Sequence, residues 1–229
     1  MRPVLLLALA LLAAAAHAQR PDPLHPEGEN LQTPPSWIVR FDDAHGHGDH
    51  AGHAPTVGAD STADVFFVNM TPGWHVTTGP AAIFYHPAST AEGAFRAEAK
   101  IHLFDPEGRN EAFGLFFGGR DLDGEAITYD YFVIRNSGEF LVKRRAGAET
   151  TELVPWTPHP AIATFGEDTE VSVPNTLTVE AGPEEVVFRI NGEEATRLPR
   201  ADVQTDGVVG LRINHRLNVH VEDLSVSDL

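Results

Sequence analysis

The sequence predicts an all-β protein, built as a sandwich or a barrel. Short runs in which apolar and polar residues alternate recur along most of the chain, which is the pattern of strands with one buried face. Glycine, asparagine and proline separate these runs at regular intervals, as turns between strands require. No long stretch carries the period of an amphipathic helix. About a dozen short strands are therefore expected.

The N-terminal half contains several of these runs. The clearest begins at Phe95, where apolar residues face one way while Glu98 and His102 face the other. Trp74 is expected in a turn region, between two shorter strands. The expected strands cover residues 37–41, 65–69, 82–85, 95–103 and 113–117.

A central hairpin is predicted between residues 129 and 145, with a two-residue turn at Ser137-Gly138. Alternation is expected to direct Phe132, Ile134 and Leu141 into the core. The same alternation directs outward the side chains of Tyr129, Tyr131, Arg135 and Arg144. In a two-residue turn, Tyr131 lies opposite Arg144.

The C-terminal third has the strongest turn signal, Asn191-Gly192, between two predicted strands. In the last strand the apolar phase slips between Val221 and Leu224, which predicts a bulge near Glu222. Alternation in the preceding strand makes Leu211 a core residue and turns Arg212 and Asn214 outward. Further strands are expected at 153–156, 175–180, 186–190, 193–198, 207–214 and 217–226.

The N-terminus resembles a cleaved export signal. Arg2, an apolar run from Val4 to Ala16 and the step Ala16-His17-Ala18 are its three parts. We expect a signal peptide over residues 1–18, a flexible leader over 19–36 and one domain over 37–229, with a His-rich insertion at 42–54. The chain has no cysteine, which favours the bacterial periplasm or exterior.

Composition limits the partners. The formal net charge of −17 disfavours nucleic acid, because an acidic surface repels phosphate groups. Apart from the signal, no run is apolar enough to insert into a membrane.

Several segments together resemble a known family. They are FGLFFGGRD from Phe113, YFVIRNSGEFLVKRR from Tyr131, FRING from Phe188, and the last two strands. In this order they are similar to the concanavalin A-like lectin/glucanase jelly roll, and especially to exported bacterial domains of the 3-keto-disaccharide hydrolase (DUF1080-type) family. The resemblance implies two antiparallel sheets, one with a concave face that often holds a saccharide. The E-x-D-x-x-E signature of laminarinase-type members is absent.

A saccharide-binding face would combine aromatic rings, which stack on sugars, with arginine guanidinium groups, which bind hydroxyl groups. Glu98 and His102 are the candidate acid and base if the protein is an enzyme. The alternative is an ordinary solvated sheet face, with the tryptophans closing the ends of the sandwich. The candidate contact residues are Trp74, Tyr129, Tyr131, Arg135, Arg144, Trp156 and Arg212.

The segment from Asp42 to His53 is rich in residues that bind Zn²⁺, Cu²⁺ or Ni²⁺. A flexible polar insertion that binds metal only adventitiously is the alternative. Calcium in the glycine-containing loops at Asp105, Asp121 and Asp123 is a lesser hypothesis. The metal candidates in the His-rich segment are His45, His47, Asp49, His50 and His53.

The leading functional hypothesis is an exported domain that binds a glycan or related ligand on a concave face without catalysis. A glycoside hydrolase or lyase is the second hypothesis, and an envelope metal-binding protein is the third. No G-x-S-x-G motif, P-loop or cysteine nucleophile is present to suggest other chemistry.

Overall fold

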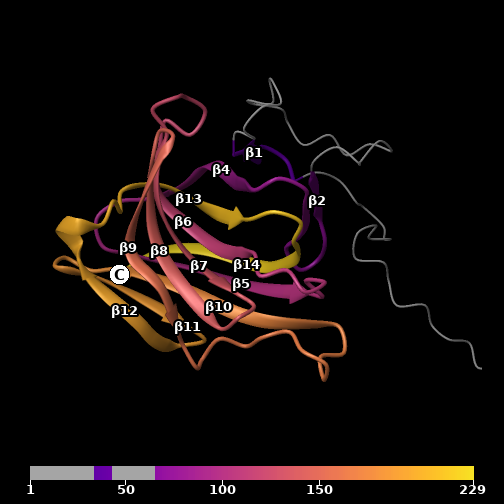
Figure 1. Cartoon of the computed structure of the whole chain (residues 1–229). Helices are drawn as coiled ribbons and strands as arrows, with labels where there is room; N and C mark the ends of the chain where they lie inside the picture. Colours follow the sequence, from indigo (N-terminus) through magenta and orange to yellow (C-terminus); the bar gives the residue numbers. More distant parts are fainter. Residues whose placement is uncertain (1–33, 43–64) are drawn as a thin grey trace, which may run out of the picture.

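The computed structural model describes residues 34–42 and 65–229. In this part of the chain, fourteen strands form two seven-stranded antiparallel sheets, which pack face to face as a jelly-roll sandwich (Figure 1). The predicted architecture is thus confirmed. Among the described residues, no helix is long and apolar enough to span a bilayer.

The first sheet has the strand order β1-β4-β13-β6-β7-β8-β9. Its outermost strand on one side, β9, is mostly exposed to solvent. The bounds are β1 (Ile38–Phe41), β4 (Ala82–Ala91), β13 (Gly207–Ile213), β6 (Ala112–Arg120), β7 (Thr128–Arg135), β8 (Glu139–Ala146) and β9 (Glu149–Pro158).

The second sheet has the order β12-β11-β10-β5-β14-β3-β2. A short 3-10 helix, η1 (Arg200–Asp202), connects β12 to β13 and so passes from the second sheet to the first. The bounds are β12 (Glu193–Pro199), β11 (Glu185–Ile190), β10 (Ser172–Ala181), β5 (Phe95–Phe104), β14 (Asn218–Asp228), β3 (Trp74–Thr78) and β2 (Val65–Asn69).

The core lies between the sheets and is rich in phenylalanine. Phe132 of β7 packs its ring 5.2 Å from Phe188 of β11 and 6.0 Å from Phe140 of β8, centroid to centroid. All three rings are almost completely buried. Each such ring contributes about 2–3 kcal/mol by leaving water, so packing between the sheets can hold a chain without disulfides together.

The central hairpin has a different register from the predicted one. Arg135 pairs with Glu139, so the loop has three residues, and Gly138 takes a φ of 81° at its third position. The amide of Gly138 donates a hydrogen bond to the carbonyl of Arg135, which closes a turn before the left-handed residue. The two-residue turn was wrong because the sequence does not reveal that Asn136 also belongs to the loop.

The extra loop residue shifts β8 by one position. Tyr131 lies opposite Lys143, and Arg144 lies opposite Asp130. Phe140 and Val142 therefore enter the core, whereas Leu141 packs on the other face of the sheet. The prediction that Leu141 is a core residue was wrong for this reason, while Phe132 and Ile134 are in the core as expected.

Two local predictions in the C-terminal third are confirmed. Asn191 and Gly192, with φ of 51° and 84°, form the two-residue turn between β11 and β12. The register of β14 against β5 shifts between Val221 and Asp223, which places the bulge at Glu222.

One strand was missed, because Trp74 was expected in a turn. Trp74 begins β3, which lies between β2 and β14. The run WHVTT gives only a weak alternation signal, because His75 and Thr78 are buried although both are polar.

Candidate ligand-binding face

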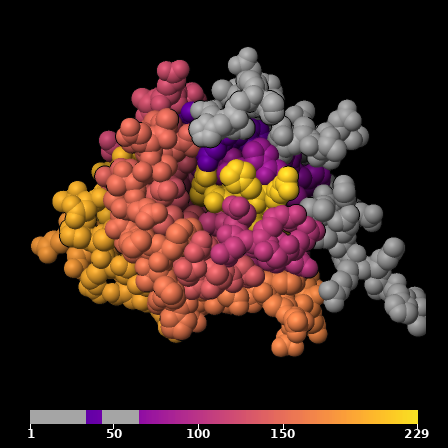
Figure 2. Space-filling model, in the orientation of Figure 1, coloured from indigo at the N-terminus to yellow at the C-terminus, as the bar shows by residue number. Residues whose placement is uncertain are grey.

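The first sheet has one face against the core and one face turned away from it. Figure 2 shows a hollow on this second face, between the salmon-coloured β8–β9 hairpin and the indigo and yellow segments of β1 and β13. We call it the hollow face. Its polar centre comprises Asp42, Tyr131, Lys143, Arg145 and Arg212, which alternate along the chain with residues of the core.

A single carboxylate lies at the centre of the hollow face. Nη1 of Arg212 donates a hydrogen bond of 2.9 Å to Oδ1 of Asp42, and Nη2 of Arg212 bonds Oδ2 of the same carboxylate. Nη1 of Arg145 also donates to Oδ1 of Asp42. Arg145 lies on β8, Arg212 on β13, and Asp42 directly follows β1, so three strands converge on this carboxylate.

The charges of this cluster are mutually stabilised. Burial alone would raise the pKa of Asp42, but the hydrogen bonds and charges of Arg212 and then Arg145 hold it below its usual value. Only 9% of the Arg212 side chain is exposed and 13% of that of Arg145. The carboxylate therefore stays ionised and fixes both guanidinium groups in place.

Aromatic side chains support the cluster from within the sheet. The Tyr131 ring lies 5.8 Å from the guanidinium carbon of Arg212 and 5.7 Å from the ring of Tyr129. Tyr131 is half-buried, and burial raises the pKa of its phenol, which therefore remains a neutral hydrogen-bond donor at physiological pH. Tyr129, which was predicted as an outward contact residue, is 1% exposed and packs between Phe116 and Tyr131, so its ring is covered and supports that of Tyr131.

A second platform lies further along the same face. The guanidinium group of Arg135 lies 4.1 Å from the centre of the Trp156 ring, within the range of a cation–π contact. Nη2 and Nε of Arg135 also donate hydrogen bonds to one oxygen of Glu139, Oε2, at 2.6 and 3.0 Å. Trp156 packs beside Leu141 and Val133, and its ring is partly exposed.

Two predicted contact residues lie elsewhere. Arg144 turns away from the hollow face and binds the fully buried carboxylate of Asp130, at 2.7 and 2.8 Å, because the register of the hairpin is shifted by one residue. Trp74 packs against Trp37, with 4.7 Å between ring centroids, at the margin of the core. This packing agrees with the alternative in which the tryptophans close the ends of the sandwich and do not contact a ligand.

The candidate acid and base lie on the opposite side of the sandwich. Glu98 and His102 project from the outer face of the second sheet, so they lie on a different sheet from Tyr131 and Arg212. Oε2 of Glu98 accepts hydrogen bonds from Arg96 and from the Thr178 hydroxyl, the latter at 2.7 Å. Nε2 of His102 lies 3.0 Å from the Glu222 carboxylate.

The loop aspartates make local turn contacts. Oδ1 of Asp105 accepts the amide of Glu107, and Oδ2 of Asp121 accepts the amide of Ala126. Within residues 34–42 and 65–229, no group of three or more histidine, aspartate or glutamate side chains is arranged to hold a metal ion. The metal candidates His45, His47, Asp49, His50 and His53 lie outside the described residues and stay a prediction.

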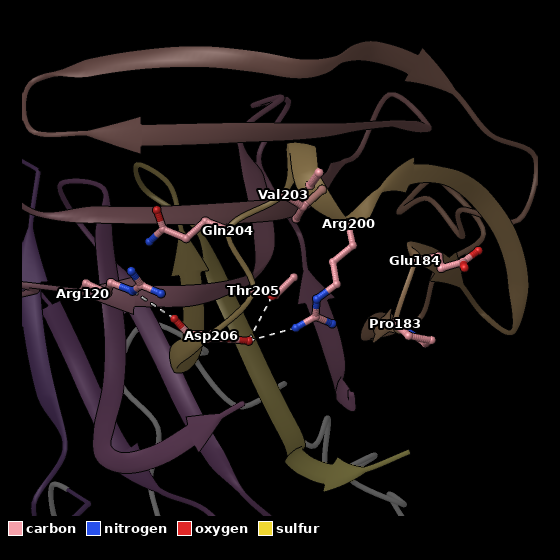
Figure 3. A pocket seen from close by; sticks show the side chains of 9 residues that line it. Arg120, Pro183, Glu184, Arg200, Val203, Gln204, Thr205 and Asp206 are labelled. Carbon is pink, nitrogen blue, oxygen red and sulfur yellow. Dashed lines mark hydrogen bonds and ion pairs between the residues drawn. The ribbon is translucent and has the colours of Figure 1, made fainter. Parts of the chain in front are cut away.

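A pocket of about 650 Å³ lies at one end of the sandwich, beside η1 (Figure 3). Arg200 donates to the Asp206 carboxylate at 3.0 Å, and Nε of Arg120 donates to the Asp206 backbone carbonyl at 3.2 Å. Arg200 also binds the Gly182 carbonyl. The charged groups lining this pocket are largely committed to one another, so we regard the hollow face as the stronger candidate site.

Sequence reasoning missed three members of the hollow face. Asp42 was grouped with the His-rich segment, whereas its carboxylate binds two arginines that are distant in sequence. Lys143 and Arg145 were missed because the two-residue turn assigned Arg144 to this face. A three-residue turn would have aligned Tyr131, Lys143 and Arg145 from the alternation alone.

No family model and no curated protein matches this sequence. Several solved structures match the fold. The carbohydrate-binding module CBM66 from Bacillus subtilis has a TM-score of 0.54 at 11% identity, over 71% of this chain and 91% of the module. A Bacillus subtilis protein of unknown function with a galectin-like fold has a TM-score of 0.50 at 12% identity, over 68% and 82%.

The A. japonicus protein CB05 has a TM-score of 0.51 at 15% identity, over 73% of this chain but only 27% of that one. At such low identities the likeness concerns architecture and not chemistry. Together with the two stacked seven-stranded sheets, these matches identify the fold as a concanavalin A-like sandwich.

Proposed function

We propose that this protein is an exported glycan-binding protein whose hollow face holds the ligand. The observation that carries the proposal is the polar centre of this face, where the half-buried Tyr131 ring lies beside the guanidinium group of Arg212, and Asp42 fixes both Arg212 and Arg145. A likeness in fold to a carbohydrate-binding module also supports it.

The chemistry of the face suits a sugar. A tyrosine or tryptophan ring can cover the apolar side of a pyranose, and its polar edge can bind a hydroxyl group. Arginines that are already held by a carboxylate lose little conformational entropy when they donate to a ligand. Tyr131 and Trp156 would therefore supply contact area, while Arg145 and Arg135 would orient the hydroxyl groups.

We assign no catalytic step to this face. A glycosidase needs a carboxylic acid that can protonate the leaving oxygen, together with a second carboxylate. Asp42 is a poor acid for this role, because Arg212 and Arg145 lower its pKa and occupy its oxygens. Binding without turnover is the function that these contacts support best.

Binding can be tested on a glycan array and then by calorimetry on the best ligand. Tyr131→Ala should weaken binding by about thirtyfold, equivalent to about 2 kcal/mol, whereas Tyr131→Phe should retain most of the stacking. Glu98→Gln on the opposite face is the matched control and should bind normally. No binding to any glycan, or unchanged binding by Tyr131→Ala, would remove the proposal.

The finer family assignment is part of this proposal. The order of the segments that resemble this family, from FGLFFGGRD to the last strand, supports a relation to the exported 3-keto-disaccharide hydrolase (DUF1080-type) domains. If that relation includes activity, a 3-keto-glucoside should be hydrolysed and Glu98→Gln should abolish the reaction. Turnover that survives this change would exclude Glu98 as the acid or base.

Export is tested directly on the mature protein. The signal at residues 1–18 predicts that the protein purified from the periplasm or medium begins at Gln19. N-terminal sequencing or intact mass gives the answer. A mature protein that retains Met1–Ala18 would contradict the cleaved signal.

A further inference from the structure

The hollow face carries more positive than negative charge. At the centre of this surface, among the described residues, Arg145, Arg212 and Lys143 lie around one carboxylate, Asp42, which is bound to both arginines. Lys143 is half-buried and, within the described residues, forms no ion pair. Its cross-strand neighbour Glu152 is an exposed residue of the edge strand, and the two side chains do not reach each other.

On the opposite sheet, by contrast, several cations are balanced by carboxylates. On the outer face of the second sheet, Arg96 binds Glu180 at 2.5 Å and also binds Glu98, while Arg189 binds Glu180 at 2.9 Å. The other lysine of the chain, Lys100, binds Glu222 at 2.7 Å. The whole chain has a formal net charge of −17, so a cationic surface within it is unexpected from composition.

Donors remain available on the hollow face after its internal bonds are made. Arg212 uses three of its five N–H groups, because its Nε donates to Asn214 and each Nη atom donates to Asp42, and its side chain is only 9% exposed. Arg145 uses Nε on the Gly147 carbonyl and Nη1 on Asp42 and also bonds the Tyr129 hydroxyl, which leaves part of its five-donor guanidinium group. Within residues 34–42 and 65–229, the ammonium group of Lys143 and the hydroxyl of Tyr131, the residue opposite it, also have no hydrogen bond or ion pair.

We propose that the ligand of the hollow face is an acidic saccharide, whose carboxylate or sulfate is bound by Lys143 and Arg145 beside the Tyr131 ring. This inference rests on the proposed glycan-binding function and names its ligand class. Lys143 and Arg145 are two residues apart on the same face of β8, so both can reach one anionic group. A half-buried ammonium without a partner gains most from an anion that displaces its water.

The acidic surface outside the hollow face affects where an acidic glycan can bind. Exposed charges more than about 8 Å apart are largely screened at physiological salt, so the distant carboxylates repel an anion only weakly. The same carboxylates discourage adsorption of a polyanion elsewhere on the surface. Binding of an acidic glycan should therefore be confined to the hollow face.

The test uses polysaccharides in matched pairs, measured by calorimetry or affinity electrophoresis. One arm compares polygalacturonate and alginate with their carboxyl-reduced forms, and a second arm compares sulfated with desulfated galactans. We expect the protein to prefer the acidic member of at least one pair by about tenfold or more. The arm that shows the preference distinguishes a carboxylate from a sulfate.

Lys143→Gln should remove most of this preference, because it weakens the binding of the acidic member. Lys100→Gln is the matched control, since it removes the other lysine from the opposite face, and it should bind as the wild type does. Equal binding of acidic and neutral members overturns the inference but leaves the glycan-binding function intact. An equal effect of the two lysine substitutions also overturns it, while failure to bind any glycan overturns both proposals.

Discussion

Asp42 is the residue on which the hollow face depends. It is separated from Arg145 by 103 positions and from Arg212 by 170, yet it binds both. It also anchors the end of β1 to β8 and β13, which are not neighbours in the sheet. The pair with Arg212 is largely withdrawn from water, so the loss of one partner leaves an uncompensated charge.

Asp42→Asn should therefore lower the free energy of unfolding by about 2–4 kcal/mol, because the buried guanidinium group of Arg212 loses its counter-charge. Urea unfolding followed by fluorescence measures the change. Glu139→Gln, which breaks the pair of Glu139 with Arg135, should cost much less, because this pair is screened by solvent. Similar losses in the two variants would contradict the central role of Asp42.

The register of the β7–β8 hairpin sets which side chains lie on the hollow face, and the three-residue loop that ends at Gly138 sets this register. A φ of 81° is strained for any residue with a Cβ. The space around Gly138 is nevertheless open, because a Cβ added there would have its nearest neighbour, Cγ2 of Thr164, at 3.9 Å. A substitution here consequently tests backbone conformation alone, without steric conflict.

We expect Gly138→Ala to destabilise the protein by about 1–2 kcal/mol, the cost of the left-handed conformation for an L-residue. Gly166→Ala is the control, since Gly166 has neither a left-handed φ nor a neighbour within 4 Å. The control should be neutral, or stabilising by at most about 1 kcal/mol. Thermal unfolding of both variants decides the point, and a neutral Gly138→Ala would show that the loop has another conformation.

Three strands of the second sheet place histidines side by side. His220 of β14 pairs with His75 of β3 and with His102 of β5, and its ring lies 6.5 and 5.8 Å from theirs. Burial, followed by the charges of His102 and His75, lowers the pKa of His220. Its ring is consequently neutral in the folded protein at pH values where the unfolded chain would already bind a proton.

This linkage predicts that stability falls as the medium becomes acidic. A lowered histidine pKa means that the unfolded state binds more protons than the folded state. The contribution of His220 to the free energy of unfolding is therefore complete above about pH 6.5 and is lost progressively as the pH falls below this value. His220→Phe should make the free energy of unfolding less dependent on pH between about 6.5 and 5. Denaturant titrations at several pH values measure this dependence.

His215→Asn is the control for this measurement, because the His215 side chain is 60% exposed and lies outside the row. It should leave the pH dependence as it is in the wild type. If His220→Phe retains the full acid dependence, the row of histidines does not sense pH and other groups must account for it.

The sequence predicts the inner face of the sandwich better than the outer one. Alternation in residues 95–103 correctly separates Ala97 and Ile101 from Glu98 and His102, because burial of one face is a local pattern. It does not reveal that Glu98 and Tyr131 belong to different sheets. Strand order depends on contacts between segments that are distant in sequence. For the same reason, the sequence does not show that the carboxylate of Asp42 binds two arginines on other strands.

The charge of the entire protein has its own consequence for stability. With a formal net charge of −17, repulsion between the carboxylates favours the expanded, unfolded chain. The exposed ion pairs of the folded protein contribute little to offset this repulsion. The screening length falls from about 30 Å at 0.01 M salt to about 8 Å at 0.15 M, which removes most of the repulsion across a domain. Added sodium chloride should therefore stabilise the folded state at neutral pH.

We expect the midpoint of thermal unfolding at pH 7.5 to rise by about 2–4 °C over this range of sodium chloride, which corresponds to roughly 1 kcal/mol for a domain of this size. The same titration at pH 5.0 is the control, because the isoelectric point of about 5.0 leaves little net charge to screen. A midpoint that falls with salt at pH 7.5 would mean that the ion pairs outweigh the repulsion. A rise of equal size at both pH values would attribute the effect to salt hydration rather than to screening.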